Sequence, residues 1–324
     1  MDGVMEVPRL TGVQKEINSW YTNKAVLHQI RDITYSRETK WNIILPSKKM
    51  WGVRHRFLGS IDYLEKELAI LDIHNRPVGM MVGTQEINWS NIPPADHPPS
   101  QLISNGSFNL SEIKNYNKDW KQIIEDPDVA KIGNQIMVFD FDDPTDLRKA
   151  FDDALAIYDY LRDQDINPSF IFSGNKGFHI WVHPEDIQKL IPVDVMTKVH
   201  TLQSWGQLLA GLVREIVSEI LGSTHWLATP PPLNTDLSPN WMQGLVRCPY
   251  SIHEKSGQIV WPLDQEEITN LDLWMDEGSL ATDVAGLLHS WVSAFSGYSG
   301  KLTYHPPHNK MYQRTLDSLR YYET

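Results

Sequence analysis

The chain is poor in cysteine, in long apolar runs and in basic charge. Its single cysteine, Cys248, excludes an internal disulfide framework and a cysteine-rich zinc module, so no structural zinc is expected. No apolar run reaches the length of about eighteen residues that a transmembrane helix needs, which predicts no membrane partner. The first residues carry Asp2 and Glu6 and no apolar stretch, so no secretory signal is expected. These features favour a reducing, cytoplasmic or other intracellular setting.

The charge balance is acidic, with a formal net charge of -12 over 324 residues. This disfavours a general nucleic-acid coat protein, although an enzyme with a local basic track stays compatible with it. A hydrophobic fraction of 41%, with twelve Trp and twelve Tyr, is typical of a folded chain rather than a disordered one. The length suits one large domain or two ordinary ones.

Hydrophobic periodicity predicts helices and strands in the same chain. Helices are expected over 1–35, 61–70, 147–161, 185–221 and from 266 onward. Strands are expected over 36–58, 77–89, 136–140, 168–172, 178–182, 245–249 and 258–262, and a loop over 90–118. The strands at 168–172 and 178–182 are predicted to form a hairpin, and those at 245–249 and 258–262 to flank a second turn.

The first chemical motif is the acidic segment 138–143, at the end of a predicted buried strand. Alternate residues of a strand face one side, so Asp140 and Asp142 should point the same way while Phe141 enters the core. Neighbouring carboxylates repel one another unless a cation neutralises them, and a pair of Mg²⁺ or Mn²⁺ ions would do so. One alternative is a solvated acidic strand end. Another is a haloacid-dehalogenase-type phosphatase, whose D-x-D-x-T pattern is broken because Thr145 comes one position late.

The second motif is the turn 173–177, which reads Ser-Gly-Asn-Lys-Gly. Its two glycines let the backbone approach a ligand, and its backbone N–H groups favour anions. Lys176 adds a compact positive charge, and His179 follows on the next strand, so both could hold the phosphates of a nucleotide. The alternative is a hairpin turn with a surface lysine and a packed histidine.

The third motif, 245–257, concentrates Arg247, His253 and Lys255. Donors of this kind suit a triphosphate or a template backbone, although a plain charged hairpin is the alternative. Asp236 lies upstream and is a natural third metal carboxylate. Taken together, acids on one strand, a phosphate-type turn and a second cationic segment are what nucleotidyl transfer needs.

In this order, the motifs resemble those of the archaeo-eukaryotic primase superfamily. The likeness is to the small catalytic subunit of archaeal and eukaryotic DNA primase and to plasmid or viral primase-polymerases. The family shows a D-x-D strand, then S-G-x-[RK]-G-x-H, then an acid followed by [RK]-x-P-x-S-x-H-x-K-[TS]-G. All three occur here, and the likeness spans residues 20–265.

The resemblance implies an α+β primase catalytic-subunit (prim-pol) fold. An N-terminal α+β module would cover 1–130, a catalytic module with an RRM-like mixed sheet 131–265, and a helical C-terminal extension 266–324. The implied catalytic and metal residues are Asp140, Asp142 and Asp236. The implied nucleotide-binding residues are Ser173, Gly174, Asn175, Lys176, Gly177, His179, Arg247, Ser251, His253 and Lys255. A cluster of basic residues is expected to guide the template: Lys48, Lys49, Arg54 and Arg56.

The implied activity is that of a DNA primase or primase-polymerase, which makes or extends primers from NTPs or dNTPs with two Mg²⁺ or Mn²⁺ ions. Its expected partners are a single-stranded DNA template, a primer strand and the nucleotides. A large primase subunit, a helicase or the rest of a longer polypeptide are further candidates. The site of action would be the cytoplasm or another intracellular replication site, the nucleus in a eukaryote. The alternative from another class is a non-catalytic, single-stranded-DNA-binding initiator module that kept the fold.

Overall fold

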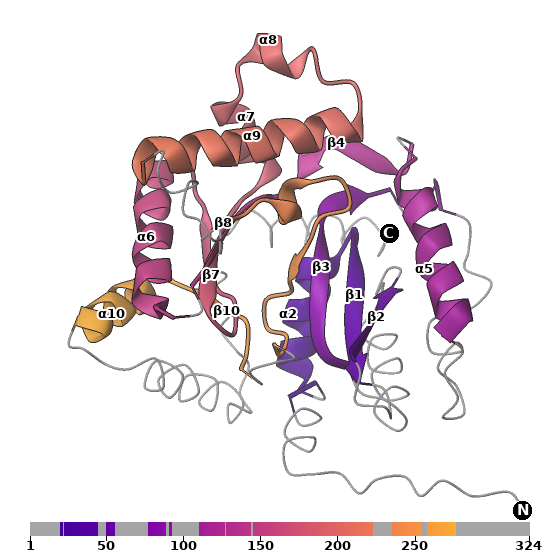
Figure 1. The fold of residues 1–324 in the computed structure, drawn as a ribbon, viewed down its shortest axis with the longest axis horizontal. Coiled ribbons are helices and arrows are strands. Elements are labelled where there is room, and N and C mark those ends of the chain that lie inside the picture. The colour runs from indigo at the N-terminus through magenta and orange to yellow at the C-terminus, as the bar shows by residue number, and fades with distance from the viewer. Residues whose placement is uncertain are drawn as a thin grey trace, which may run out of the picture.

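The computed structural model describes residues 20–21, 23–44, 50–55, 77–88, 91–92, 110–126, 128–143, 145–222, 235–253 and 258–276. In this part of the chain, two β-sheets lie next to each other and helices pack around them (Figure 1). None of the helices in these ranges is long and apolar enough to cross a membrane.

The first sheet is built mainly from the N-terminal part of the chain. Its order is β2-β1-β3-β4, with β9 paired to β3, and every pair is antiparallel. The strands are β1 (Arg37–Ile44), β2 (Met50–His55), β3 (Pro77–Ile87), β4 (Ala130–Gln135) and β9 (Leu245–Arg247). Helix α2 (Lys24–Thr34) contacts β1 and β3, and α5 (Leu110–Ile124) contacts β2.

The second sheet carries the acidic strand. Its order is β10-β6-β7-β5-β8, again with antiparallel pairs only. The strands are β5 (Met137–Asp142), β6 (Ser169–Phe172), β7 (Gly177–Val182), β8 (Thr235–Asp236) and β10 (Trp261–Leu263). Every residue of β6 and β7 is buried, which fits their largely apolar sequences; Ser169 and His179 are the polar exceptions.

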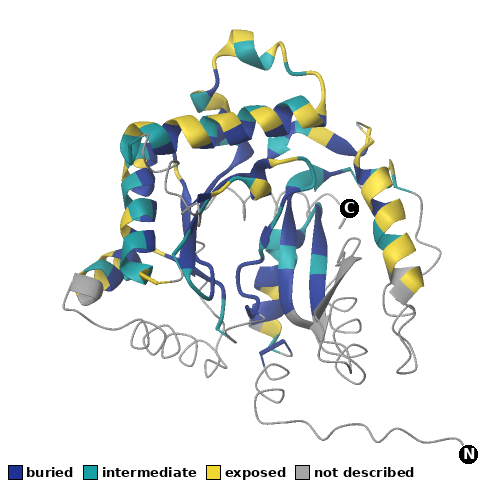
Figure 2. Ribbon diagram, viewed as in Figure 1, coloured by how far each residue is buried: buried dark blue, intermediate teal, exposed yellow. Residues whose placement is uncertain are grey.

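Helices α6 (Leu147–Asp163) and α9 (Leu202–Ile220) cover the second sheet. Helix α6 begins because the Asp146 side chain accepts a hydrogen bond from the Lys149 backbone N–H. Both helices bury one stripe and expose the other, as the alternating colours in Figure 2 show. The described residues also form the short or peripheral helices α7 (Pro184–Leu190), α8 (Val193–Met196), η4 (Ser238–Asn240) and α10 (Gln265–Asp276).

The two sheets share one hydrophobic core. Trp41 and Met80 of the first sheet belong to the same buried cluster as Phe139 and Phe178 of the second. The chain passes from β4 directly into β5 at Ile136, whose backbone N–H donates to the Thr84 carbonyl of β3 at 2.9 Å. The third motif and the residues just after it therefore reach both sheets, since β9 joins the first sheet and β10 the second.

The α+β class is confirmed, as are the helix over 147–161 and the hairpin of β6 and β7. The catalytic sheet was expected to be mixed, but its strand pairs among the described residues are all antiparallel. The loop over 90–118 is wrong from residue 110, where α5 begins and buries Trp120 against the sheet. Strands β9 and β10 pair with β3 and β6 rather than with each other. The segments between them do meet around the second turn, through a bridge between Ile252 and Ile259 and a hydrogen bond from the Tyr250 N–H to the Val260 carbonyl at 2.7 Å. The predicted helix over 61–70 lies outside the described residues.

Candidate active site

Strand β5 sorts its side chains by alternation. Phe139 and Phe141 are fully buried, while Asp140 and Asp142 are half-buried. Since successive strand residues face opposite sides, the two carboxylates share one face and the two rings share the other. The expectation that Asp140 and Asp142 point the same way while Phe141 enters the core is confirmed.

The register of the second sheet brings the other predicted groups to Asp140. His179 of β7 lies opposite Asp140 on one side, and Asp236 of β8 lies opposite it on the other. The Nε2 atom of His179 is 3.3 Å from Oδ1 of Asp140. Residues that are far apart in the sequence thus meet on three adjacent strands.

Asp142 meets the second motif. The Nζ atom of Lys176 lies 2.8 Å from Oδ2 of Asp142. Gly177 lies opposite Asp142, and a Cβ atom on Gly177 would come within 2.5 Å of Oδ1 of that aspartate. The glycine is required because a Cβ atom there would collide first with the backbone carbonyl of Phe141, and also with the carboxylate of Asp142.

The surroundings of Asp140 disfavour the charged form of its carboxyl group. Burial raises its pKa above the ordinary value, and the charges of Asp142 and Asp236 raise it further, against the lowering effect of His179. Within the described residues, Oδ1 of Asp140 is buried and accepts no well-aligned hydrogen bond, despite the nearby imidazole. A buried carboxylate oxygen without a well-aligned hydrogen bond is suited to bind a cation, because the positive charge would offset the free-energy cost of burying the carboxylate.

The carboxylate of Asp236 is held by hydrogen bonds from Ser238, two residues later in the chain. Its Oδ1 accepts from the Ser238 backbone N–H at 2.8 Å, and its Oδ2 accepts from the Ser238 hydroxyl at 2.7 Å. Among the described residues, no group of three or more acidic, histidine or cysteine side chains forms a ready-made cation cluster. Strand register makes Asp140 and Asp236 neighbours, Asp142 follows two residues later in the same strand, and Asp236 is held in a hydrogen-bonded turn.

The turn between β6 and β7 is closed by backbone bonds. The Ser173 N–H donates to the Gly177 carbonyl at 2.9 Å, and the Asp143 N–H donates to the Lys176 carbonyl at 3.0 Å. Ser173 is buried, whereas Asn175 and Lys176 are half-buried and partly open to solvent. The second bond ties the turn to the end of the acidic strand.

The third motif reaches the same turn through His253. Gly174 has φ +84°, and a Cβ atom there would lie 2.8 Å from Cβ of His253. His253 is itself buried and is anchored by its N–H, which donates to the Gln258 carbonyl at 2.7 Å. The second and third motifs therefore touch, as nucleotide binding by both would require.

The remaining residues of the third motif take different positions. Arg247 is half-buried in β9, opposite Met81 of β3. The Ser251 hydroxyl is fully buried and donates to the carbonyls of Cys248 at 2.6 Å and Met80 at 3.2 Å. Lys255 lies outside the described residues. Ser251 thus holds the motif against the first sheet.

The predicted template residues are mostly untested. Lys48, Lys49 and Arg56 lie outside the described residues. Arg54 lies in β2 with its backbone opposite Lys40 of β1. The basic cluster remains a prediction.

Sequence reasoning missed two polar residues close to Asp236. Ser238 binds the carboxylate directly, and Asn240 is fully buried next to β5. A Ser-Pro-Asn sequence after a candidate ligand is a sign of a tight turn. Nothing in the sequence, however, indicates which strand the asparagine would contact.

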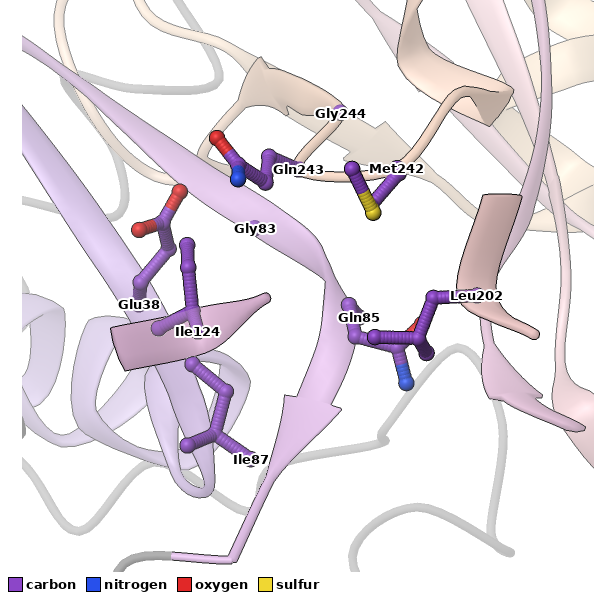
Figure 3. A pocket seen from close by; sticks show the side chains of 9 residues that line it. All are labelled: Glu38, Gly83, Gln85, Ile87, Ile124, Leu202, Met242, Gln243 and Gly244. Carbon is purple, nitrogen blue, oxygen red and sulfur yellow. The ribbon is translucent and has the colours of Figure 1, made fainter. Parts of the chain in front are cut away.

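A separate pocket is lined by residues of the first sheet and of the segments next to it. Figure 3 shows Glu38 and Ile124 on one side of β3 and Leu202 on the other. The carboxylate of Glu38 is buried and accepts a hydrogen bond from the indole of Trp120 at 2.6 Å. None of the predicted site residues lines this pocket.

No protein-family model and no curated protein matches the chain. Among solved structures, it is similar to the polymerase domain of Ligase D from Mycobacterium tuberculosis, in complex with DNA. The sequence identity is 14% and the TM-score 0.49, with 79% of this chain and 83% of that chain covered.

Proposed function

We propose that the chain is a nucleotidyltransferase of the DNA primase or primase-polymerase type. It would transfer nucleotides from NTPs or dNTPs to a primer end, or to a first nucleotide, on a single-stranded DNA template. The observation that carries the proposal is the register that sets Asp140 between His179 and Asp236, with Lys176 against Asp142 beside them. Acidic and basic side chains from the first two motifs, together with Asp236, thereby converge on one part of the second sheet.

The acids would hold the divalent cations. Asp140, Asp142 and Asp236 lie on adjacent strands, and the buried oxygen of Asp140 is suited to accept a cation. Carboxylate oxygens are the ligands that Mg²⁺ and Mn²⁺ prefer. When bound, such ions activate an attacking 3′-hydroxyl and neutralise charge on a triphosphate.

The basic side chains would hold the triphosphate. Lys176 is partly exposed at the end of β5, and His253 packs against the same turn. His179 and Arg247 are proposed as further phosphate contacts. Donors held in place before the substrate arrives position the phosphates and stabilise negative charge as it develops. Lys255 and the basic cluster of Lys48, Lys49, Arg54 and Arg56 would add template and phosphate contacts whose strength falls with salt.

The test is nucleotide incorporation by the full chain on single-stranded DNA, with and without a primer. Labelled NTPs and dNTPs are supplied in turn with Mg²⁺ and with Mn²⁺. The double variant Asp140→Asn/Asp142→Asn removes the charge of the acidic strand at nearly constant volume. Asp152→Asn is the matched control, because Asp152 lies on α6 in an ordinary surface ion pair with Arg148.

We expect incorporation by wild type and by Asp152→Asn, and none by the double variant. Equal incorporation by the double variant would overturn the metal assignment. Binding of single-stranded DNA without any nucleotide incorporation, under all metal and sugar combinations, would favour the non-catalytic initiator module. Phosphate release from a monoester without template would favour the phosphatase.

A further inference from the structure

Strand β8 is too short to cover the edge of β5 beside it. Among the residues that the structure describes, it pairs with Asp140 and Phe141 alone, and the chain turns away after Asp236. Val138, two residues earlier in β5, points its N–H and C=O toward the same edge as Asp140. A buried backbone pair left open there would be costly, so another group has to complete the ladder.

The side chain of Asn240 completes it. Its Oδ1 accepts from the Val138 N–H at 2.8 Å, and its Nδ2 donates to the Val138 carbonyl at 2.6 Å. One donor and one acceptor in a plane reproduce a peptide group, so the amide acts as one more residue of β8. Val138 and Asn240 are both fully buried.

Residues of the first sheet also form hydrogen bonds with the turn that contains Asn240. Gln135 of β4 donates to the Asn240 carbonyl at 3.0 Å and to the Thr84 hydroxyl at 3.1 Å. The Thr84 hydroxyl in turn donates to the Pro239 carbonyl at 2.9 Å. These polar groups are buried and satisfied, so they specify one geometry for the turn rather than several.

This turn contains the groups that hold the third aspartate. The Ser238 N–H and hydroxyl both bind the carboxylate of Asp236, and Asn240 ends the same short helix, η4. Fixing Asn240 on β5 therefore fixes Ser238, and through it the carboxylate of Asp236. We propose that Asn240 is a positioning residue, which holds Asp236 beside Asp140 by extending strand β8 with its side chain. This rests on the proposed function, in which Asp236 is a metal ligand.

Mn²⁺ binding to the full chain, without nucleotide or DNA, tests this role directly. Electron paramagnetic resonance of free Mn²⁺ gives the affinity for wild type and for Asn240→Asp, which keeps the shape but presents a second acceptor to the Val138 carbonyl. Partners that orient metal ligands typically contribute about 10–100-fold in affinity, and we expect a loss in that range. Thr34→Val is the matched control, because it removes a buried hydrogen bond to the Ile30 carbonyl in α2 without touching either sheet edge.

Ser238→Ala covers the case in which Asn240→Asp does not fold. Ser238 is exposed, so its loss should leave folding intact while removing the hydroxyl bond to Asp236. We expect weaker Mn²⁺ binding here as well, and unchanged binding in Thr34→Val. In turnover, kcat should fall while KM for the nucleotide stays close to wild type, since the phosphate contacts are untouched.

Different results would overturn the proposed function and the role of Asn240. Mn²⁺ binding that is absent in wild type, or is unaffected by Asp140→Asn/Asp142→Asn, would overturn the proposed function and this inference with it. Mn²⁺ binding that depends on those aspartates but is unchanged in a folded Asn240→Asp, or in Ser238→Ala if that variant is needed, would overturn the role of Asn240 alone. An equal loss in Thr34→Val would show that general destabilisation, not positioning, weakens the site.

Discussion

Gly174 joins two of the three motifs, and its substitution by alanine tests that junction. The residue has φ +84°, and a Cβ atom would lie 2.8 Å from Cβ of His253 and 3.3 Å from Cγ2 of Val260. Gly174→Ala should therefore destabilise the fold in two separable ways. One is the left-handed backbone, and the other is the contact with the third motif.

The expected size follows from these two terms. A left-handed backbone costs a non-glycine residue about 1–2 kcal/mol. A carbon at 2.8 Å from another is well inside the distance of about 3.5 Å at which carbons pack. Overpacking of this kind costs about 1–3 kcal/mol, so the sum is about 2–5 kcal/mol of unfolding free energy.

Alanine variants of two other glycines separate the backbone contribution from the packing contribution. Gly133 also has a left-handed backbone, at φ +88°, but nothing lies within 4 Å of its Cβ position, so Gly133→Ala should show the backbone term alone. Gly211 lies in α9 with open space around it, and Gly211→Ala should stabilise the protein by about 0.5–1 kcal/mol. Urea unfolding followed by circular dichroism measures all three variants. If Gly174→Ala loses no more stability than Gly133→Ala, the packing of the turn against His253 is refuted.

Two further predictions concern single ionisable groups. Burial, with the charges of Asp142 and Asp236, raises the pKa of Asp140, so the folded form binds the proton more tightly and Asp140 costs stability as pH rises through that raised pKa. Asp140→Asn should therefore melt above wild type at about pH 7 in EDTA, with a difference that shrinks toward about pH 4; a pH-independent difference would contradict this. Burial likewise raises the pKa of the Cys248 thiol. A disulfide reagent should therefore label Cys248 only as fast as the chain unfolds, and rapid labelling of the folded protein would show that the thiol is accessible.

Local sequence patterns were sufficient for much of the fold. The stripe of apolar residues in α6 and the alternation of β5 depend on the periods of helix and strand alone, so both could be predicted. The segment over 110–118 could not, because its polar residues resemble a loop and Trp120 reveals a helix only when the sheet beneath it is known. Strands β9 and β10 were recognised as strands, but their partners are set by β3 and β6, which are distant in the chain.

The amino-acid sequence was enough to list the residue types of the candidate site: two aspartates at alternating positions, a glycine turn with a lysine, and a cationic segment around His253. How these residues meet could be seen only in the folded chain. Strand register placed Asp236 and His179 on either side of Asp140, and the side chain of Asn240 completed the strand edge beside them. This is because residue spacing sets the direction of a side chain within its own strand, whereas pairing between distant strands depends on packing and hydrogen bonds throughout the fold.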